Sequence, residues 1–166
     1  NIEWSAFLQN SNTVFEQYVR KILEIGLDEH VEKFKEEKNY AVIRYEDKDI
    51  ARGYSPDILI GYDQSTDSCM AVFDVKNKEF SSNEIKSKKV PSSADIYQLS
   101  FYCKRLKTSL GGLIYPSSEN LEPLMVSIDD ENELMFLLVS INMNENIRIR
   151  HEKLINTIRE QILTRS

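Results

Sequence analysis

Two aspartates and a lysine have the types and spacing needed for metal-dependent hydrolysis. Asp57 opens one apolar run, and Asp74-Val75-Lys76 closes the next run, seventeen positions later. Side chains alternate between the faces of a strand, so Asp74 and Lys76 share a face. If the two runs pair as neighbouring strands, Asp57 and Asp74 converge on one cation with the ammonium group beside it. Carboxylate oxygens suit Mg²⁺ or Mn²⁺, and such a site would hydrolyse a phosphodiester bond.

Each of these motifs, taken alone, also has an ordinary structural explanation. Asp57 after Pro56 could start a strand from a turn, and Asp74-Val75-Lys76 could be the exposed face of an edge strand. The run 71–75 is otherwise apolar, however, and burying an unpaired carboxylate is costly. The combination of both motifs at this spacing therefore favours a cation site.

Three more residues are candidates for the same site. Glu16 lies at the margin of the apolar stripe of the first helix, where a surface role is the alternative. Gln98 and Tyr102 are four positions apart, so they share a helix face, where core-edge packing is the alternative. In a nuclease, Gln98 would hold the water, the lysine or a phosphate, with Tyr102 as support.

Hydrophobic periodicity and turn residues predict the elements that must position these side chains. Strands joined by the short polar turn 63–68 should pair antiparallel. The order predicts an α/β domain with a mixed central sheet flanked by helices, as one domain over 1–166 with its core at about 14–116 and additions at 117–166. The expected elements are a helix at 14–25, a partly exposed helical extension at 28–38, strands at 40–45, 56–62 and 70–77, a mobile loop at 79–93, a helix from Ser92, Ser93 or Asp95 to about Leu106, a short strand at 113–115 between Gly111-Gly112 and Pro116, strands at 124–128 and 134–141, and a helix at 146–163.

Composition excludes several other classes of protein. A chain of 166 residues with 41% hydrophobic and 29% charged residues can form one globular core. It has no apolar stretch long enough for a membrane span and no signal-peptide pattern, so a cytoplasmic location is expected. Cys69 and Cys103 are expected to be buried, reduced thiols, and His30 and His151 are too far apart to suggest a metal site. Because the chain does not begin with methionine, we expect a fragment or a processed product.

Basic residues are concentrated in two segments, although the net charge is −6. Five lysines fall between positions 76 and 89, and a second cluster occupies 104–107. Phosphate contacts position a DNA-binding protein without specifying sequence, whereas a solvated loop and helix face is the alternative explanation. The candidate DNA-contacting residues are Lys78, Lys86, Lys88, Lys89, Tyr102 and Lys104.

The motifs together resemble the PD-(D/E)XK nuclease superfamily. More narrowly, they are similar to the nuclease domain of McrC proteins, the cutting subunits of McrBC-type modification-dependent restriction systems. Five short strings occur in the family's order between Val14 and Pro116. They are Phe15-Glu16-Gln17-Tyr18-Val19, Ser55-Pro56-Asp57-Ile58, Asp74-Val75-Lys76-Asn77-Lys78, Asp95-Ile96-Tyr97-Gln98-Leu99 and Leu113-Ile114-Tyr115-Pro116.

This resemblance implies a restriction-endonuclease-like core with a four-stranded mixed sheet. It also implies that Asp57 and Asp74 bind Mg²⁺ or Mn²⁺, with Glu16 assisting the metal or the water. By position, Lys76 matches the catalytic lysine and Gln98 an accessory residue of the site, while Lys78 matches a second lysine that touches DNA. The implied activity is Mg²⁺-dependent DNA endonuclease cleavage in a restriction or antiviral defence system.

The implied partners are DNA, a GTP-hydrolysing AAA+ subunit similar to McrB, and a second copy of the chain, with no membrane. The chain has no Gly-x-x-x-x-Gly-Lys loop of its own. McrC proteins usually carry a further N-terminal region that docks on the motor, so we expect an isolated catalytic domain or a short variant that docks by its terminal helix. The alternatives are another branch of the superfamily, such as a repair or phage-encoded nuclease that acts on DNA ends, and a non-catalytic DNA-binding or assembly module.

Overall fold

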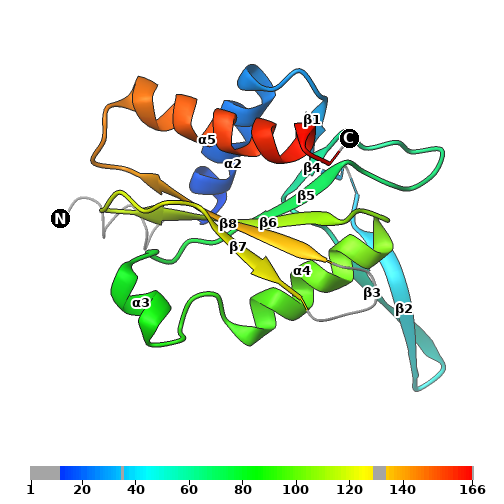
Figure 1. Cartoon of the computed structure of the whole chain (residues 1–166). Coiled ribbons are helices and arrows are strands. Elements are labelled where there is room, and N and C mark those ends of the chain that lie inside the picture. Colours follow the sequence, from blue (N-terminus) through cyan, green and yellow to red (C-terminus); the bar gives the residue numbers. More distant parts are fainter. Residues whose placement is uncertain (1–11, 35, 129–133, 166) are drawn as a thin grey trace.

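The computed structural model describes residues 12–34, 36–128 and 134–165 (Figure 1). Helices and strands are interspersed along the chain. Element labels follow Figure 1. The elements are α2 (Asn12–Gly26), β1 (Val31–Glu32), β2 (Lys38–Tyr45), β3 (Lys48–Tyr54), β4 (Ile58–Ile60), β5 (Ala71–Val75), α3 (Ser82–Lys86), α4 (Ser93–Arg105), β6 (Leu110–Ser117), β7 (Leu124–Ser127), β8 (Met135–Asn142) and α5 (Ile147–Leu163).

A mixed six-stranded sheet forms the centre of the fold, in the order β1-β4-β5-β6-β8-β7. The β4–β5 pair is antiparallel, as expected for strands joined by a short turn, whereas β5, β6 and β8 run parallel. Helices α2 and α5 cover one face of the sheet, and α4 covers the other (Figure 1). The structure thus confirms the predicted α/β class and mixed sheet, with six strands where the resemblance implied four.

Two hydrophobic clusters fill the spaces between the sheet and its helices. On one side, Phe15, Val19 and Leu23 of α2 pack against β5 and α5 residues. On the other side, Leu99 and Cys103 of α4 pack against the opposite faces of the same strands. Both sides of the central strands are therefore buried, which explains why their sequences are continuously apolar.

The α4 helix, which supplies several candidate site residues, begins at a well-defined N-terminus. Ser92 is the N-cap, and its hydroxyl accepts a hydrogen bond from the backbone N–H of Asp95 at 3.1 Å. The Asp95 carboxylate accepts in return from the backbone N–H of Ser92 at 3.4 Å. This reciprocal capping box satisfies two helix donors and fixes where the helix starts.

The structure corrects the expected helical extension at 28–38. This segment instead contains the two-residue strand β1, which pairs with β4. Its charged residues suit an exposed helix, but among the described residues of this segment only Val31 is buried. Pairing at the sheet edge, and not helix formation, satisfies the backbone hydrogen bonds of β1.

A second correction is the strand β3, which the sequence patterns did not predict. It forms a separate two-stranded hairpin with β2 that projects from the body of the domain (Figure 1). Its turn residues Glu46 and Asp47 both have positive φ, 48° and 60°. Such turns usually carry Asn or Gly, so Glu-Asp gives no recognisable turn signal.

The segment 79–93 is not the mobile loop that was expected. It contains the short helix α3, and two of its apolar residues, one on each side of α3, are buried anchors. Phe80 is fully buried and stacks on Tyr115 with ring centroids 4.8 Å apart, and Val90 is also buried. Isolated anchors of this kind have no periodicity, so the polar sequence around them suggested a loop.

The strand β6 is longer than the predicted 113–115. Gly111, Gly112 and Pro116 lie inside it rather than at its ends. A Cβ atom at Gly112 would lie 2.1 Å from a ring carbon of Phe73, so the glycine is needed for close packing and not for a turn.

Candidate active site

Asp57 and Asp74 lie opposite one another at the end of the β4–β5 ladder. Ile58 pairs with Phe73, and continuing this register by one residue places Asp57 across from Asp74. Cross-strand partners project to the same face, here the face covered by α4. The Asp57 Oδ2 atom also accepts a hydrogen bond of 2.8 Å from the backbone N–H of Val75. The expected convergence of the two carboxylates is therefore present.

The contact between these carboxylates changes the acidity of Asp57. Burial raises the pKa of Asp57, and the neighbouring Asp74 raises it further, to about 8, against the opposing hydrogen bond from Val75. Two carboxylates this close cannot both ionise without a compensating cation. Near neutral pH, Asp57 therefore retains a proton, and a bound cation would remove the need for it.

Lys76 lies beside this pair and is surrounded by three acceptors. Its Nζ atom is 2.7 Å from Oδ2 of Asp74, 3.0 Å from Oδ1 of Asp95 and 2.9 Å from Oε1 of Gln98. An ammonium group has three N–H donors, so each donor has one partner. Burial alone would lower the pKa of Lys76, but Asp74 and Asp95 raise it above its usual value. The site thus holds a protonated lysine in a fixed position.

Asp95 is a member of this cluster that sequence reasoning missed as a functional residue. It is buried, and it joins the capping box of α4 to the ammonium group of Lys76. Burial raises the pKa of Asp95, but the hydrogen bonds from Ser92 and Lys76 outweigh it and lower the pKa. Its place as the third residue of a helix start masked it, because an acidic residue there is common for capping alone.

Gln98 and Tyr102 both face the site from α4, as their spacing predicted. The Gln98 side chain accepts a hydrogen bond from Lys76, and it lies near the Tyr102 hydroxyl, whose pKa it influences. Tyr102 is only 5% exposed, so it supports Gln98 from within the core and is not placed to contact DNA directly. Burial, followed by the charges of Asp74 and Asp57, raises the pKa of Tyr102.

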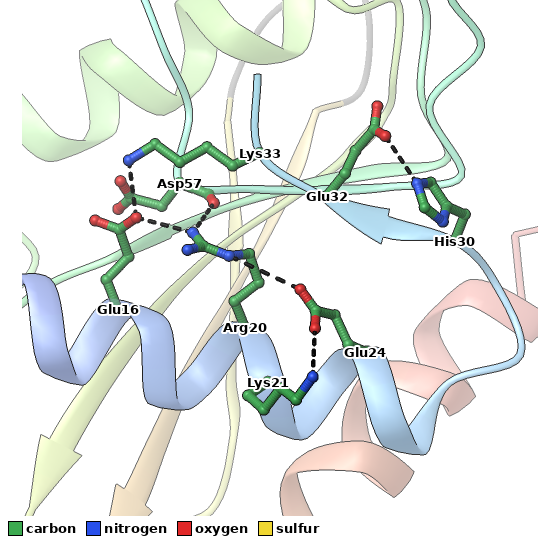
Figure 2. A network of polar contacts seen from close by, with 8 residues as sticks. All are labelled: Glu16, Arg20, Lys21, Glu24, His30, Glu32, Lys33 and Asp57. Atoms are coloured by element: carbon green, nitrogen blue, oxygen red, sulfur yellow. Dashed lines mark hydrogen bonds and ion pairs between the residues drawn. The ribbon is translucent and has the colours of Figure 1, made fainter. Parts of the chain in front are cut away.

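Glu16 reaches the edge of the site from α2, on the Asp57 side (Figure 2). Its Oε1 atom lies 2.9 Å from both Arg20 and Lys33, and Arg20 also donates to the backbone carbonyl of Asp57 at 3.3 Å. Burial opposes ionisation of Glu16, but these two cations lower its pKa. Glu16 is therefore an ionised carboxylate that helps to fix α2 against the start of β4.

The donor atoms at this site fit a magnesium or manganese ion. Within residues 12–34, 36–128 and 134–165, no three His, Cys, Asp or Glu side chains form a group arranged to hold a metal. The carboxylate pair of Asp57 and Asp74 remains, and Mg²⁺ commonly binds one or two carboxylates and completes its shell with water and phosphate oxygens. The histidines bond elsewhere, His30 to Glu32 and His151 to Tyr18. Hard oxygen donors alone favour Mg²⁺ or Mn²⁺ over zinc.

The other basic candidates for DNA contact lie on the surface. Lys78 follows β5, and its Nζ atom is 3.7 Å from Asp95, next to the carboxylate–lysine cluster. The candidates on α3, on the turn after it and on α4 are all exposed, namely Lys86, Lys88, Lys89 and Lys104.

The two cysteines are buried, and burial raises the pKa of each thiol to about 12, so they are unreactive thiols.

These features define a class of protein: an α/β domain whose mixed sheet presents two acidic residues and a lysine at the ends of adjoining strands. A protein-family model described as "McrBC 5-methylcytosine restriction system component" matches residues 2–116, more than half of the chain. The chain therefore belongs to this family, as the sequence strings predicted. The comparison with curated individual proteins gave no match.

Membership of this family makes the chain a component of a restriction system. All candidate site residues, from Glu16 to Gln98, fall inside the matched range. The matched range ends within β6, while β8 and α5 pack into the same core as α2 and β5. In the described part of the chain, no helix has the length and apolar character needed to cross a membrane.

Proposed function

We propose that this protein is the DNA-cutting component of its restriction system, a Mg²⁺-dependent endonuclease of the PD-(D/E)XK type. The observation that carries the proposal is the juxtaposition of Asp57, Asp74 and Lys76 at one end of the β4–β5 pair. Neither two adjacent carboxyl groups, one of them with a raised pKa, nor a lysine held in its charged form is needed to pack the core. The same arrangement is suited to an ion and a phosphate group.

The proposed chemistry assigns a separate task to each side chain. Asp57 and Asp74 hold the ion, which when bound would supply Lewis acidity and a water of lowered pKa. The donors of Lys76 are taken by Asp74, Asp95 and Gln98, so Lys76 would act through its positive charge, which offsets negative charge that develops on the phosphate oxygens. Gln98 keeps the ammonium group in place, so that no reorganisation is needed when the substrate arrives. Glu16, through Arg20, keeps Asp57 in register with Asp74.

DNA would be positioned by the lysines around the site. Lys78 lies beside the cluster, and the exposed lysines near α3 extend the positive surface along the chain after β5. Contacts of this kind bind the phosphate backbone without reading sequence. Recognition of a modified base and GTP hydrolysis would then belong to a partner, for which an AAA+ subunit similar to McrB is the expected candidate.

The direct test is cleavage of a covalently closed plasmid in Mg²⁺, with and without a GTP-hydrolysing subunit similar to McrB. We expect nicking or linearisation by the native protein and none by Asp74→Ala or Lys76→Ala, both with unchanged circular dichroism. Asp49→Ala, at an exposed position of β3, is the matched control and should cut normally. Cutting by the Asp74→Ala variant would overturn the assignment of the site. Degradation of linear DNA alone would instead indicate an exonuclease.

A further inference from the structure

Three aromatic side chains from α4 and β2 lie near one another on the surface. We call Tyr97, Phe101 and Tyr40 the aromatic strip. Tyr97 and Phe101 are one turn apart on α4, and Tyr40 comes from β2, with its ring centroid 4.9 Å from that of Phe101. Tyr97 is 74% exposed and Tyr40 is 49% exposed. A single exposed aromatic ring is ordinary, but here rings from two separate elements, Phe101 of α4 and Tyr40 of β2, are in contact.

The centre of the strip, Phe101, is braced from below, so the position of this ring is fixed before any ligand binds. Phe101 packs edge-on against the buried Tyr54, with ring centroids 5.7 Å apart and planes at 87°. Arg105 lies over the Tyr54 ring at 5.6 Å. Aromatic rings held in this way lose little conformational freedom when a flat partner stacks on them.

The neighbours of the strip indicate what kind of partner it fits. Phe101 lies three positions after Gln98 on α4, so the two are neighbours on the helix surface, and the Gln98 side chain holds Lys76 at the proposed site of phosphodiester cleavage. Lys104 lies one turn beyond Phe101, and Arg105 follows it, both exposed. Flat aromatic surface flanked by cations is the combination that binds single-stranded nucleic acid, because bases stack on the rings while phosphates contact the cations.

We infer that the aromatic strip stacks nucleobases of an unpaired DNA strand next to the phosphate that is cut. In a duplex, the faces of the bases are covered by neighbouring base pairs, so the strip can act only on bases that are unstacked or unpaired. The inference rests on the proposed nuclease function, and it adds that DNA with unpaired bases at the cleavage point is a preferred substrate class.

The test measures binding without cleavage. The full chain in EDTA is titrated into a fluorescent single-stranded oligonucleotide and into the corresponding duplex, and anisotropy gives the two affinities. Tyr97→Leu keeps an apolar side chain but removes the ring, and Tyr97→Phe keeps the ring. Tyr45→Leu, at a 61% exposed aromatic of the β2–β3 hairpin outside the strip, is the matched control. A second oligonucleotide carries 2-aminopurine, whose emission is quenched when it stacks.

We expect Tyr97→Leu to bind the single strand roughly tenfold more weakly, with loss of quenching and little change for the duplex. Tyr97→Phe and Tyr45→Leu should both bind as the native protein does. Single-strand binding unchanged in Tyr97→Leu would overturn the inference, as would an equal loss for duplex and single strand. Loss of binding to a protein component of the system, with DNA binding intact, would also overturn it and identify the strip as a protein interface.

Failure of this inference can be separated from failure of the proposed nuclease function. The binding measurement involves no metal and no cleavage, so it is independent of the plasmid assay. If the native protein cuts plasmid DNA but the Tyr97→Leu variant binds the single strand as tightly as the native protein does, only the role of the aromatic strip is contradicted. If single-strand binding depends on the Tyr97 ring but the native protein never cuts DNA, the role of the strip is supported and the nuclease function is contradicted.

Discussion

The Nζ atom of Lys76 lies 3.0 Å from Oδ1 of Asp95, a carboxylate that also caps the start of α4. One side chain therefore connects the N-terminus of a helix to the amine at the end of a strand. The position of Lys76 relative to Asp74 depends on where α4 begins. This couples a local feature of helix capping to the geometry of the candidate site.

Replacing Asp95 by Asn should separate its two roles. The Asn oxygen can still accept the capping hydrogen bond, but the negative partner of Lys76 is lost, so Lys76 is held less firmly. We expect kcat for plasmid cleavage to fall roughly tenfold with little change in KM, as for other residues that orient a reacting group. Ser92→Ala is the control, because it removes the cap and leaves the Lys76 pair. It should lower the melting temperature without the loss in kcat, and equal effects of the two variants would reduce Asp95 to a structural residue.

Metal binding should depend on the carboxylate pair and much less on Glu16. Calorimetric titration with Mn²⁺ is expected to show one site in the native protein and no measurable binding in Asp57→Asn or Asp74→Asn. Glu16→Gln should retain the site with modestly lower affinity, because Glu16 is engaged by Arg20 and Lys33. A Glu16→Gln variant without any binding would make Glu16 a direct ligand.

The stability of the metal-free protein should fall as the pH rises from about 4 to about 8. In the folded protein the pKa of Asp57 is raised to about 8, from a usual value of 3.8. Between these values the folded state holds a proton that the unfolded chain has released, so the free energy of unfolding decreases with pH by at most about 1.4 kcal/mol per pH unit. Urea unfolding in EDTA across this window measures the slope.

Asp57→Asn is the variant that isolates this effect. An amide does not ionise, so the variant should lose the part of the slope that Asp57 contributes. Saturating Mn²⁺ should also flatten the dependence in the native protein, since a bound ion would displace the proton from Asp57. An identical slope in the native protein and in Asp57→Asn would show that the pKa of Asp57 is not raised in the folded state.

Close packing at Gly112 should make its replacement by Ala strongly destabilising. The added methyl group would meet a ring carbon of Phe73 at 2.1 Å and the Leu137 carbonyl at 2.9 Å, and the sheet cannot move away from either. Overpacking of this kind costs about 1–3 kcal/mol, measurable by chemical denaturation. Gly53→Ala is the control, because its methyl group would meet only the flexible side chain of Glu37. Comparable losses in the two variants would contradict this account of β6.

Much of the fold followed from local patterns in the sequence. The helices at α2, α4 and α5 were predictable because apolar residues recur at helical spacing, with a capping serine before α4. The shared face of Asp57, Asp74 and Lys76 was predictable because a strand alternates its side chains. The hairpin β2–β3 and the segment around α3 were not, since an unusual turn and two isolated anchors, Phe80 and Val90, give no periodic signal.

The sequence by itself determined which groups could perform chemistry, because residue type and strand alternation fix the acids, the amine and their common face. Only the tertiary structure decided how those groups interact. Asp95 joins Lys76 because α4 packs across the sheet with its first turn over the end of β5, and Glu16 pairs with Lys33 because the chain after α2 returns past β4. Tyr40 meets Phe101 because the hairpin folds onto α4. These contacts join residues far apart in the chain, and no local pattern specifies such distances.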